Sequence, residues 1–224
     1  MNELMQECIL SDEQRSVLLK AIKSGKEEFI SEKQRITNTI TKKSNPFRLT
    51  DLVNTFVSNS IEANPHMQMK VYVKQSGFHP YIVIHDTIKN TFILVLKLPK
   101  NKWIFNPSKY RGEFASSNVD RLTNLGIPKE ELIRDTPYQA SLNLGATNQP
   151  FGIIICYDSK SDIVFEGALR PDQEDWLYKE DISDYIDIQR ENIVPINNYD
   201  LSEIEISLKP NVEEDIVVKL KKNK

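Results

Sequence analysis

Two stretches of this chain follow the same pattern, and that pattern limits how the chain can fold. Residues 82–99, IVIHDTIKNTFILVLKLP, contain an apolar run, a short polar turn that Asp86 opens, and a second apolar run that ends in proline. Residues 153–171, IIICYDSKSDIVFEGALRP, repeat this order, with Asp158 at the start of the turn. An aspartate suits that place because its carboxylate accepts hydrogen bonds from the backbone amides that follow it. Each stretch therefore predicts an antiparallel hairpin.

The remaining elements follow from the spacing of the apolar residues. Residues 67–74, MQMKVYVK, alternate apolar and polar side chains, as a half-buried strand does. Ser11 and Gln14 form a capping box at the start of a helix that Gly25 is expected to interrupt. Further helices are expected over 26–41, from residue 50 to about 61, over 117–125 and over 171–188, and closing strands in EIEISL and DIVVKL.

Neighbouring hairpins with helices set apart favour an α+β fold, with a mainly antiparallel sheet built from hairpins and packed helices. The helical pattern of residues 26–41 has few apolar side chains for a core helix. We therefore expect residues 1–45 to form an N-terminal helical arm that packs on a partner or on a second copy of the chain. Residues 46–224 then form a single α+β domain, and the 224 residues suffice for one sizeable core.

Composition and motifs exclude some classes of function. Glycine is scarce at 7 residues, and neither G-x-x-x-x-G-K-[ST] nor G-x-G-x-x-G occurs, so we expect no nucleotide cofactor. Cys8 and Cys156 lie far apart without a C-x-x-C motif, which favours two buried thiols over a disulfide or a metal site. The N-terminus lacks a secretory pattern, and no apolar run approaches the roughly 20 residues of a membrane span. We expect a soluble, cytoplasmic protein, and the Lys-, Asn- and Ile-rich usage suggests a bacterial or phage source.

The first hairpin resembles, over part of its length, the core of the PD-(D/E)xK nucleases. That family places an acidic residue on one strand and an acidic-x-Lys motif on the next, where the side chains bind a divalent metal. Asp86 and Lys97 match the first acid and the lysine, whereas Val95 stands where the second acid is required. In the second hairpin Glu166 is present, but Ala168 replaces the lysine. The resemblance implies a degenerate metal-dependent nuclease, with a further acid supplied by the fold.

Charge is patterned most sharply between Thr87 and Gly112, which contain six basic residues and no acidic one. Lysines neutralise phosphates, while aromatic side chains and arginine stack on bases or fill a partner's pocket. The candidate partner-binding residues are Lys97, Lys100, Lys102, Trp103, Lys109, Tyr110 and Arg111. The alternative is that the lysines protect an edge strand and that Trp103 and Phe105 belong to the core.

Residues 166–191 have the opposite sign, with nine acidic and three basic residues and hence a net charge of −6. They predict an acidic face that is either solvated or in contact with a basic surface.

The sequence thus supports two functions. The first is a non-enzymatic binding or regulatory protein that engages a macromolecular partner, protein or nucleic acid, through the basic-aromatic loop. Phage- or mobile-element-related biology would suit it. The second is the degenerate nuclease. We favour the first because the basic and aromatic residues are concentrated in one loop and the sequence contains no complete catalytic constellation, so no catalytic or metal-ligating residue is assigned, although enzymatic activity stays open. The two differ in whether Asp86, Lys97, Asp158 and Glu166 converge in space.

Overall fold

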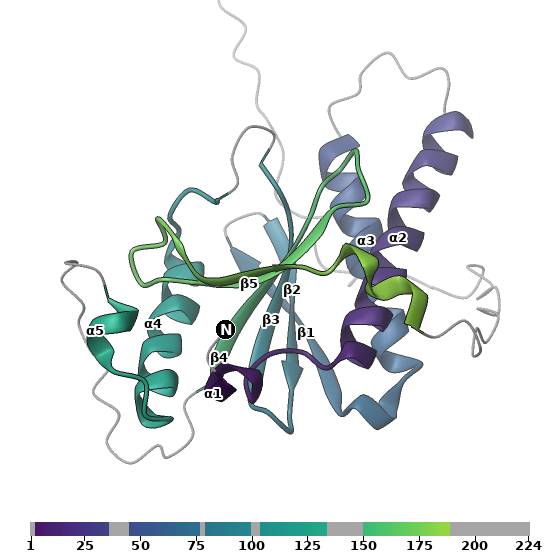
Figure 1. The fold of residues 1–224 in the computed structure, drawn as a ribbon. Helices are drawn as coiled ribbons and strands as arrows, with labels where there is room; N and C mark the ends of the chain where they lie inside the picture. The colour runs from purple at the N-terminus through teal and green to yellow at the C-terminus, as the bar shows by residue number, and fades with distance from the viewer. Residues whose placement is uncertain (1–2, 36–44, 77–78, 100–103, 134–149, 189–224) are drawn as a thin grey trace, which may run out of the picture. The chain divides into compact units, whose positions relative to one another are not determined.

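The structure, a computed structural model, describes residues 3–35, 45–76, 79–99, 104–133 and 150–188 (Figure 1). Three helices come first: α1 (Glu3–Gln6), α2 (Asp12–Arg35) and α3 (Asn45–Glu62). The 3₁₀ helix η1 (Pro65–Met67) leads into strands β1 (Met69–Ser76), β2 (His79–Asp86) and β3 (Thr91–Lys97). Helices α4 (Lys109–Asn124) and α5 (Lys129–Leu132) precede β4 (Phe151–Tyr157), β5 (Val164–Leu169), β6 (Trp176–Asp181) and the 3₁₀ helix η2 (Ser183–Ile188).

The six strands form one sheet in chain order, and every neighbouring pair is antiparallel except β3 and β4. Parallel strands need a crossover connection, and the segment that contains α4 provides it. Both predicted hairpins are confirmed, as is the α+β class. Asp86 Oδ1 accepts the amides of Ile88 and Lys89 at 2.9 and 3.1 Å, and Asp158 Oδ2 accepts the amide of Ser161 at 2.9 Å. Each aspartate therefore fixes its turn as the sequence predicts.

The two faces of the sheet are covered by different helices (Figure 1). Ile84, Ile93 and Ile155 are fully buried in one apolar cluster together with Leu18 of α2 and Val53 of α3. The alternate residues of the same strands lie in a second cluster with Ala115 of α4. Because side chains alternate along a strand, both faces can be buried only when apolar residues occupy nearly every position, as the run FGIIICY of β4 does.

Helix α2 is continuous, so the expected interruption at Gly25 is wrong. The capping box is confirmed: Ser11 N donates to Gln14 Oε1 at 2.9 Å and Gln14 N donates to Ser11 Oγ at 3.2 Å. Gly25 instead allows α3 to approach, because a Cβ there would lie 2.7 Å from Val53 Cα. The glycine marks a close contact between two helices.

Helix α4 also differs from its prediction, since it begins at Lys109 and not near Ser117. The fully buried Asn118 ties this helix to β4: its Nδ2 donates to the carbonyl of Gly152 at 3.0 Å, and Gly152 N donates to its Oδ1. Gly152 lies outside the β4–β5 register, which begins at Ile154. The Asn118 side chain therefore forms the hydrogen bonds of the Gly152 N–H and C=O groups in place of a neighbouring strand.

The predicted helix over 171–188 is wrong, because this segment contains β6 and η2. The acidic residues after Pro171 form a turn and not the first turn of a helix. Asp172 Oδ1 accepts the amide of Glu174 at 2.9 Å, and Gln173 adopts a left-handed conformation with φ 60°. Tyr178 then lies on the buried side of a strand that pairs with β5.

The described residues belong to one compact unit. The strands predicted in EIEISL and DIVVKL lie outside the described residues. A separate arm over residues 1–45 stays a prediction, and so does self-association through it. Three side chains of α2, those of Leu18, Leu19 and Ile22, are buried in the main apolar cluster. Deletion of residues 1–45 would therefore also remove side chains from the core. Within the described residues, no helix combines the length and the apolar character of a membrane span.

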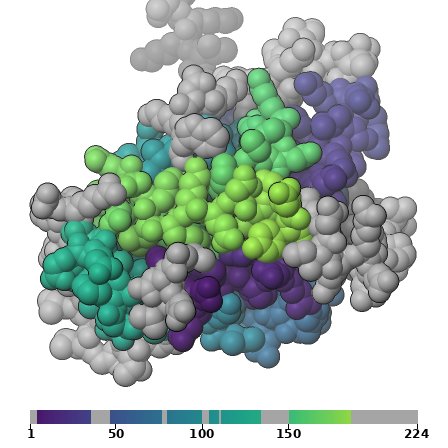
Figure 2. All heavy atoms as spheres, in the orientation of Figure 1, coloured from purple at the N-terminus to yellow at the C-terminus, as the bar shows by residue number. Residues whose placement is uncertain are grey.

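A buried ionic network joins α2 to the far strands of the sheet. Glu166 on β5 is completely buried, and its Oε2 accepts a hydrogen bond from Arg15 Nε at 2.7 Å. Its Oε1 accepts from Tyr178 Oη at 2.8 Å, and Arg15 Nη2 donates to Glu180 at 2.8 Å. The Arg15 guanidinium also lies 4.9 Å from the ring centre of Tyr185. Figure 2 shows the N-terminal residues beside the β6–η2 segment on this face.

Replacing Arg15 alone should be strongly destabilising. R15M leaves the Glu166 carboxylate buried without its cation, and we expect the free energy of unfolding to fall by about 3–5 kcal/mol. The double variant R15M/E166Q removes both charges and should lose less than the two single variants added together. Urea denaturation of the four proteins measures this coupling.

E180Q is the matched control. The Glu180 side chain is 31% exposed, so loss of its ion pair with Arg15 should cost no more than about 1 kcal/mol. Additive effects of R15M and E166Q would show that the two side chains do not stabilise each other.

Candidate functional site

The residues that match the nuclease pattern do not meet. Asp86 is the last residue of β2 and pairs with Thr91, the first residue of β3. Lys97 is the last residue of β3, six positions further on, which corresponds to about 20 Å along a strand. Lys97 pairs with Tyr157, so it lies at the same end of the sheet as Asp158 and not as Asp86.

The two buried acids are already occupied by protein groups. Asp86 is 1% exposed, and its Oδ2 accepts a hydrogen bond from Gln14 Nε2 at 2.8 Å while its Oδ1 holds the turn. Glu166 is bound by Arg15 and Tyr178, and the amide of Leu10 also donates to it at 3.3 Å. Hydrogen bonds from Ser161 lower the pKa of Asp158. In the ranges that the structure covers, no three His, Cys, Asp or Glu side chains lie close enough together to hold a metal ion.

The Gln14–Asp86 contact gives a test of what Asp86 does. D86N replaces one carboxylate oxygen of Asp86 with an NH₂ group. This donor then faces another donor, either Gln14 Nε2 or the turn amides, so one hydrogen bond is lost and the free energy of unfolding should fall by roughly 1–3 kcal/mol. In D86N/Q14E the donor and acceptor of the contact are exchanged, and part of that loss should be recovered. The carboxylate that Q14E introduces can still accept the Ser11 amide, so the capping box is kept. Urea denaturation of both variants and of Q14E completes the cycle.

The nuclease alternative makes the opposite prediction for D86N. Mg²⁺- or Mn²⁺-dependent cleavage of nucleic acid that D86N abolishes, with the fold intact, would make Asp86 a catalytic residue. We expect no such cleavage, because both carboxylate oxygens of Asp86 already accept hydrogen bonds within the protein.

The two cysteines are free and buried, as the sequence predicts. Burial raises the pKa of the Cys156 thiol, and burial likewise raises that of Cys8. A thiol acts as a nucleophile only as thiolate, so neither side chain is set up for nucleophilic chemistry at neutral pH.

The structure describes only part of the predicted basic-aromatic loop. Lys100, Lys102 and Trp103 lie outside the described residues, as does the side chain of Tyr110. Lys97 is half-buried at the end of β3, and Lys109 is exposed at the start of α4. The guanidinium of Arg111 lies 5.1 Å from the ring centre of Phe105 and donates to the carbonyl of Asn106. Phe105 is 7% exposed and packs in the core.

The parallel strands β3 and β4 finish at the same end of the sheet (Figure 1). Lys97 pairs with Tyr157, and Lys160 follows in the turn that joins β4 to β5. Helix α4 begins at Lys109. The amide of Ser108, directly before it, donates to Gln173 Oε1 in the β5–β6 turn at 2.9 Å, and Asn118 in its middle contacts Gly152. We call Lys97, Lys109, Arg111 and Lys160 the basic surface. The carboxyl ends of parallel strands are where α/β sheets commonly bind ligands.

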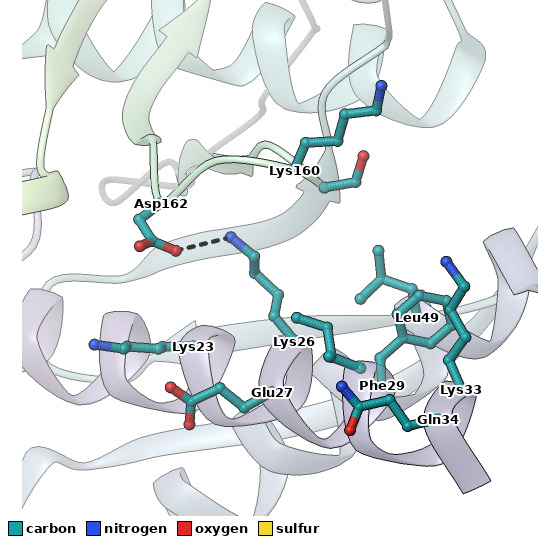
Figure 3. A pocket seen from close by; sticks show the side chains of 11 residues that line it. Lys23, Lys26, Glu27, Phe29, Lys33, Gln34, Leu49, Lys160 and Asp162 are labelled. Atoms are coloured by element: carbon teal, nitrogen blue, oxygen red, sulfur yellow. Dashed lines mark hydrogen bonds and ion pairs between the residues drawn. The ribbon is translucent and has the colours of Figure 1, made fainter.

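A hollow of about 500 Å³ lies next to the same turn, between it and helix α2 (Figure 3). Lys26 reaches from α2 to the turn, where its Nζ donates to the carbonyl of Ser161 at 2.5 Å and lies 3.3 Å from Asp162 Oδ1. Sequence reasoning missed this site, because its walls come from segments more than a hundred residues apart. One signal was present: the lining residues Lys23, Lys26, Ile30 and Lys33 fall on one face of a helix.

Comparison of the chain with family models, curated proteins and solved structures gives no match.

Proposed function

We propose that this chain is a non-enzymatic binding or regulatory protein that engages a macromolecular partner through the basic surface and the adjoining loop, Lys97–Arg111. The observation that carries the proposal is the pairing of Lys97 with Tyr157. This register brings the end of β3 next to the β4–β5 turn, so cations from separate parts of the sequence share one end of the sheet.

The spacing of these cations favours a large partner over a compact ion. They come from the end of β3, the start of α4 and the β4–β5 turn. Residues 87–112 contain no acidic residue, whereas the β4–β5 turn contains Asp158 and Asp162 beside Lys160. A partner with regularly spaced negative charges, either phosphates or carboxylates, can contact all three segments together. The nuclease has less support, because Asp86 pairs with the first residue of β3 whereas Lys97 is its last.

Neutralising the basic surface should weaken binding selectively. For K97Q/K109Q, the slope of log affinity against log salt with a single-stranded oligonucleotide should fall by about one unit for each lysine. If the partner is an acidic protein, tested here with polyglutamate, the same variant should slow association and reduce its salt dependence. W103A should weaken oligonucleotide binding by about 1–3 kcal/mol per stacked base and leave the slope unchanged.

The matched control is K70Q/K129Q, which changes the net charge equally. Lys70 is exposed on β1 and pairs with His85, which pairs with Phe92, so it lies near the opposite end of β3. Lys129 is exposed on α5. Fluorescence anisotropy over a range of salt concentrations compares the two double variants. Equal binding by K97Q/K109Q and wild type for both probes would refute the proposal.

A further inference from the structure

The hollow beside α2 has a basic rim and an apolar floor. We call it the α2 groove and define it by Lys23, Ile30 and Lys33 on α2, Leu49 on α3, and Lys160 on the β4–β5 turn. Its three defining lysines are exposed, whereas Leu49 is buried. Lys26, Glu27 and Asp162 also line it, so the groove contains four lysines and two carboxylates. The net charge of these six side chains is therefore +2.

The groove is elongated along the helix. The lining runs from Lys23 to Gln34, which corresponds to about 16 Å of α-helix. Ile30 lies near the middle of this line and is 54% exposed, so its side chain offers apolar surface to a ligand. The half-buried Phe29 lies next to it in the lining. Charge therefore alternates with apolar surface over about three helical turns.

One contact fixes the opposite wall. Lys26 is 9% exposed, and its bond to the Ser161 carbonyl holds the β4–β5 turn against α2. Asp158 shapes the same turn, because it accepts both the amide and the hydroxyl of Ser161 at 2.9 and 2.7 Å. The groove is therefore preformed, and a ligand need not order its walls.

We propose that the α2 groove binds an acidic polypeptide segment whose carboxylates alternate with apolar side chains. The carboxylates pair with Lys23, Lys33 and Lys160 at the rim, and the apolar side chains pack on Ile30 and Leu49. In this mode of peptide recognition, the segment lies along the groove and a few of its side chains determine the specificity of binding. The site lies outside the Lys97–Arg111 loop but shares Lys160 with the basic surface, so it extends the proposed function, and its test changes Lys23 and Lys33, which the basic surface does not contain.

Nucleic acid fits this groove less well than polypeptide. Single-strand sites stack successive bases on aromatic side chains, and the lining offers only the half-buried Phe29. Among the described residues, the lining contains no arginine, the residue that binds phosphates with two parallel hydrogen bonds. Glu27 and Asp162 would also repel a phosphate backbone.

The test begins with a phage-displayed library of random peptides of about 12 residues, a length that spans the groove whether helical or partly extended. Selection on the full chain should enrich peptides in which Asp or Glu alternates with Leu, Ile or Phe. The most enriched peptide is then labelled for fluorescence anisotropy. K23E/K33E should weaken its binding by about tenfold or more, since two attractions become repulsions. I30S should weaken it about fivefold through lost apolar contact.

Two controls separate this site from its alternatives. K70E/K129E makes the same change in net charge and should bind the peptide like wild type, as should K97E/K109E. Thermal melts check that K23E/K33E, which changes only exposed side chains, keeps the fold. The inference is overturned if no acidic-apolar peptide is enriched, or if K23E/K33E binds the selected peptide as tightly as wild type. It is also overturned if peptide binding is lost in K97E/K109E and kept in K23E/K33E, because the loop would then be the peptide site.

Discussion

Glu166 lies in β5 with its side chain completely buried, and a carboxylate in that position stays ionised at low cost only when a cation and hydrogen-bond donors reach it. Arg15 supplies the cation from a helix that lies 151 positions earlier in the chain, and Tyr178 supplies a hydroxyl from the neighbouring strand. Once Glu166 is buried, α2 can take few other positions. Helix α2 in turn contacts α3 closely at Gly25, and both helices pack on the sheet in one apolar cluster, so the ion pair and this cluster together hold the helices on that face.

The segment before α2 is fixed in the same manner, through backbone groups. The carbonyl of Cys8 accepts a hydrogen bond from Thr91 Oγ1, and the carbonyl of Ile9 accepts one from Lys89 Nζ. The amide of Leu10 donates to Glu166. Backbone groups of three consecutive residues thus form hydrogen bonds with side chains of the sheet and of its β2–β3 turn. These bonds replace the backbone hydrogen bonds that a helix or strand would otherwise provide. The charged side chains of Arg15, Glu166 and Lys89 therefore join the N-terminal segment to the sheet.

The sequence predicts the parts of the fold that local chemistry decides. Both hairpins, the capping box at Ser11 and the helix over residues 50–61 follow from patterns of a few residues each. The helix predicted after Pro171 fails because acidic residues favour a helix N-terminus and an aspartate turn alike, and pairing with β5 decides between them. Gly25 fails for a similar reason: a glycine inside a helical pattern signals either a break or a close neighbour, and the neighbour here is α3. Neither choice can be made without tertiary contacts.

The candidate sites show the same limit. A run of cations between residues 87 and 112 is visible in the sequence, but the α2 groove needs Lys160 beside Lys23 and Lys33. The aspartate of the second hairpin explains how that proximity arises. Asp158 fixes Ser161, and the Ser161 carbonyl receives Lys26 of α2, so the turn becomes a wall of the groove. The aspartate of the first hairpin, Asp86, accepts Gln14 of the same helix through its other oxygen. The two hairpins therefore hold α2 at two points 12 residues apart, about 18 Å along the helix, and the groove lies at the second.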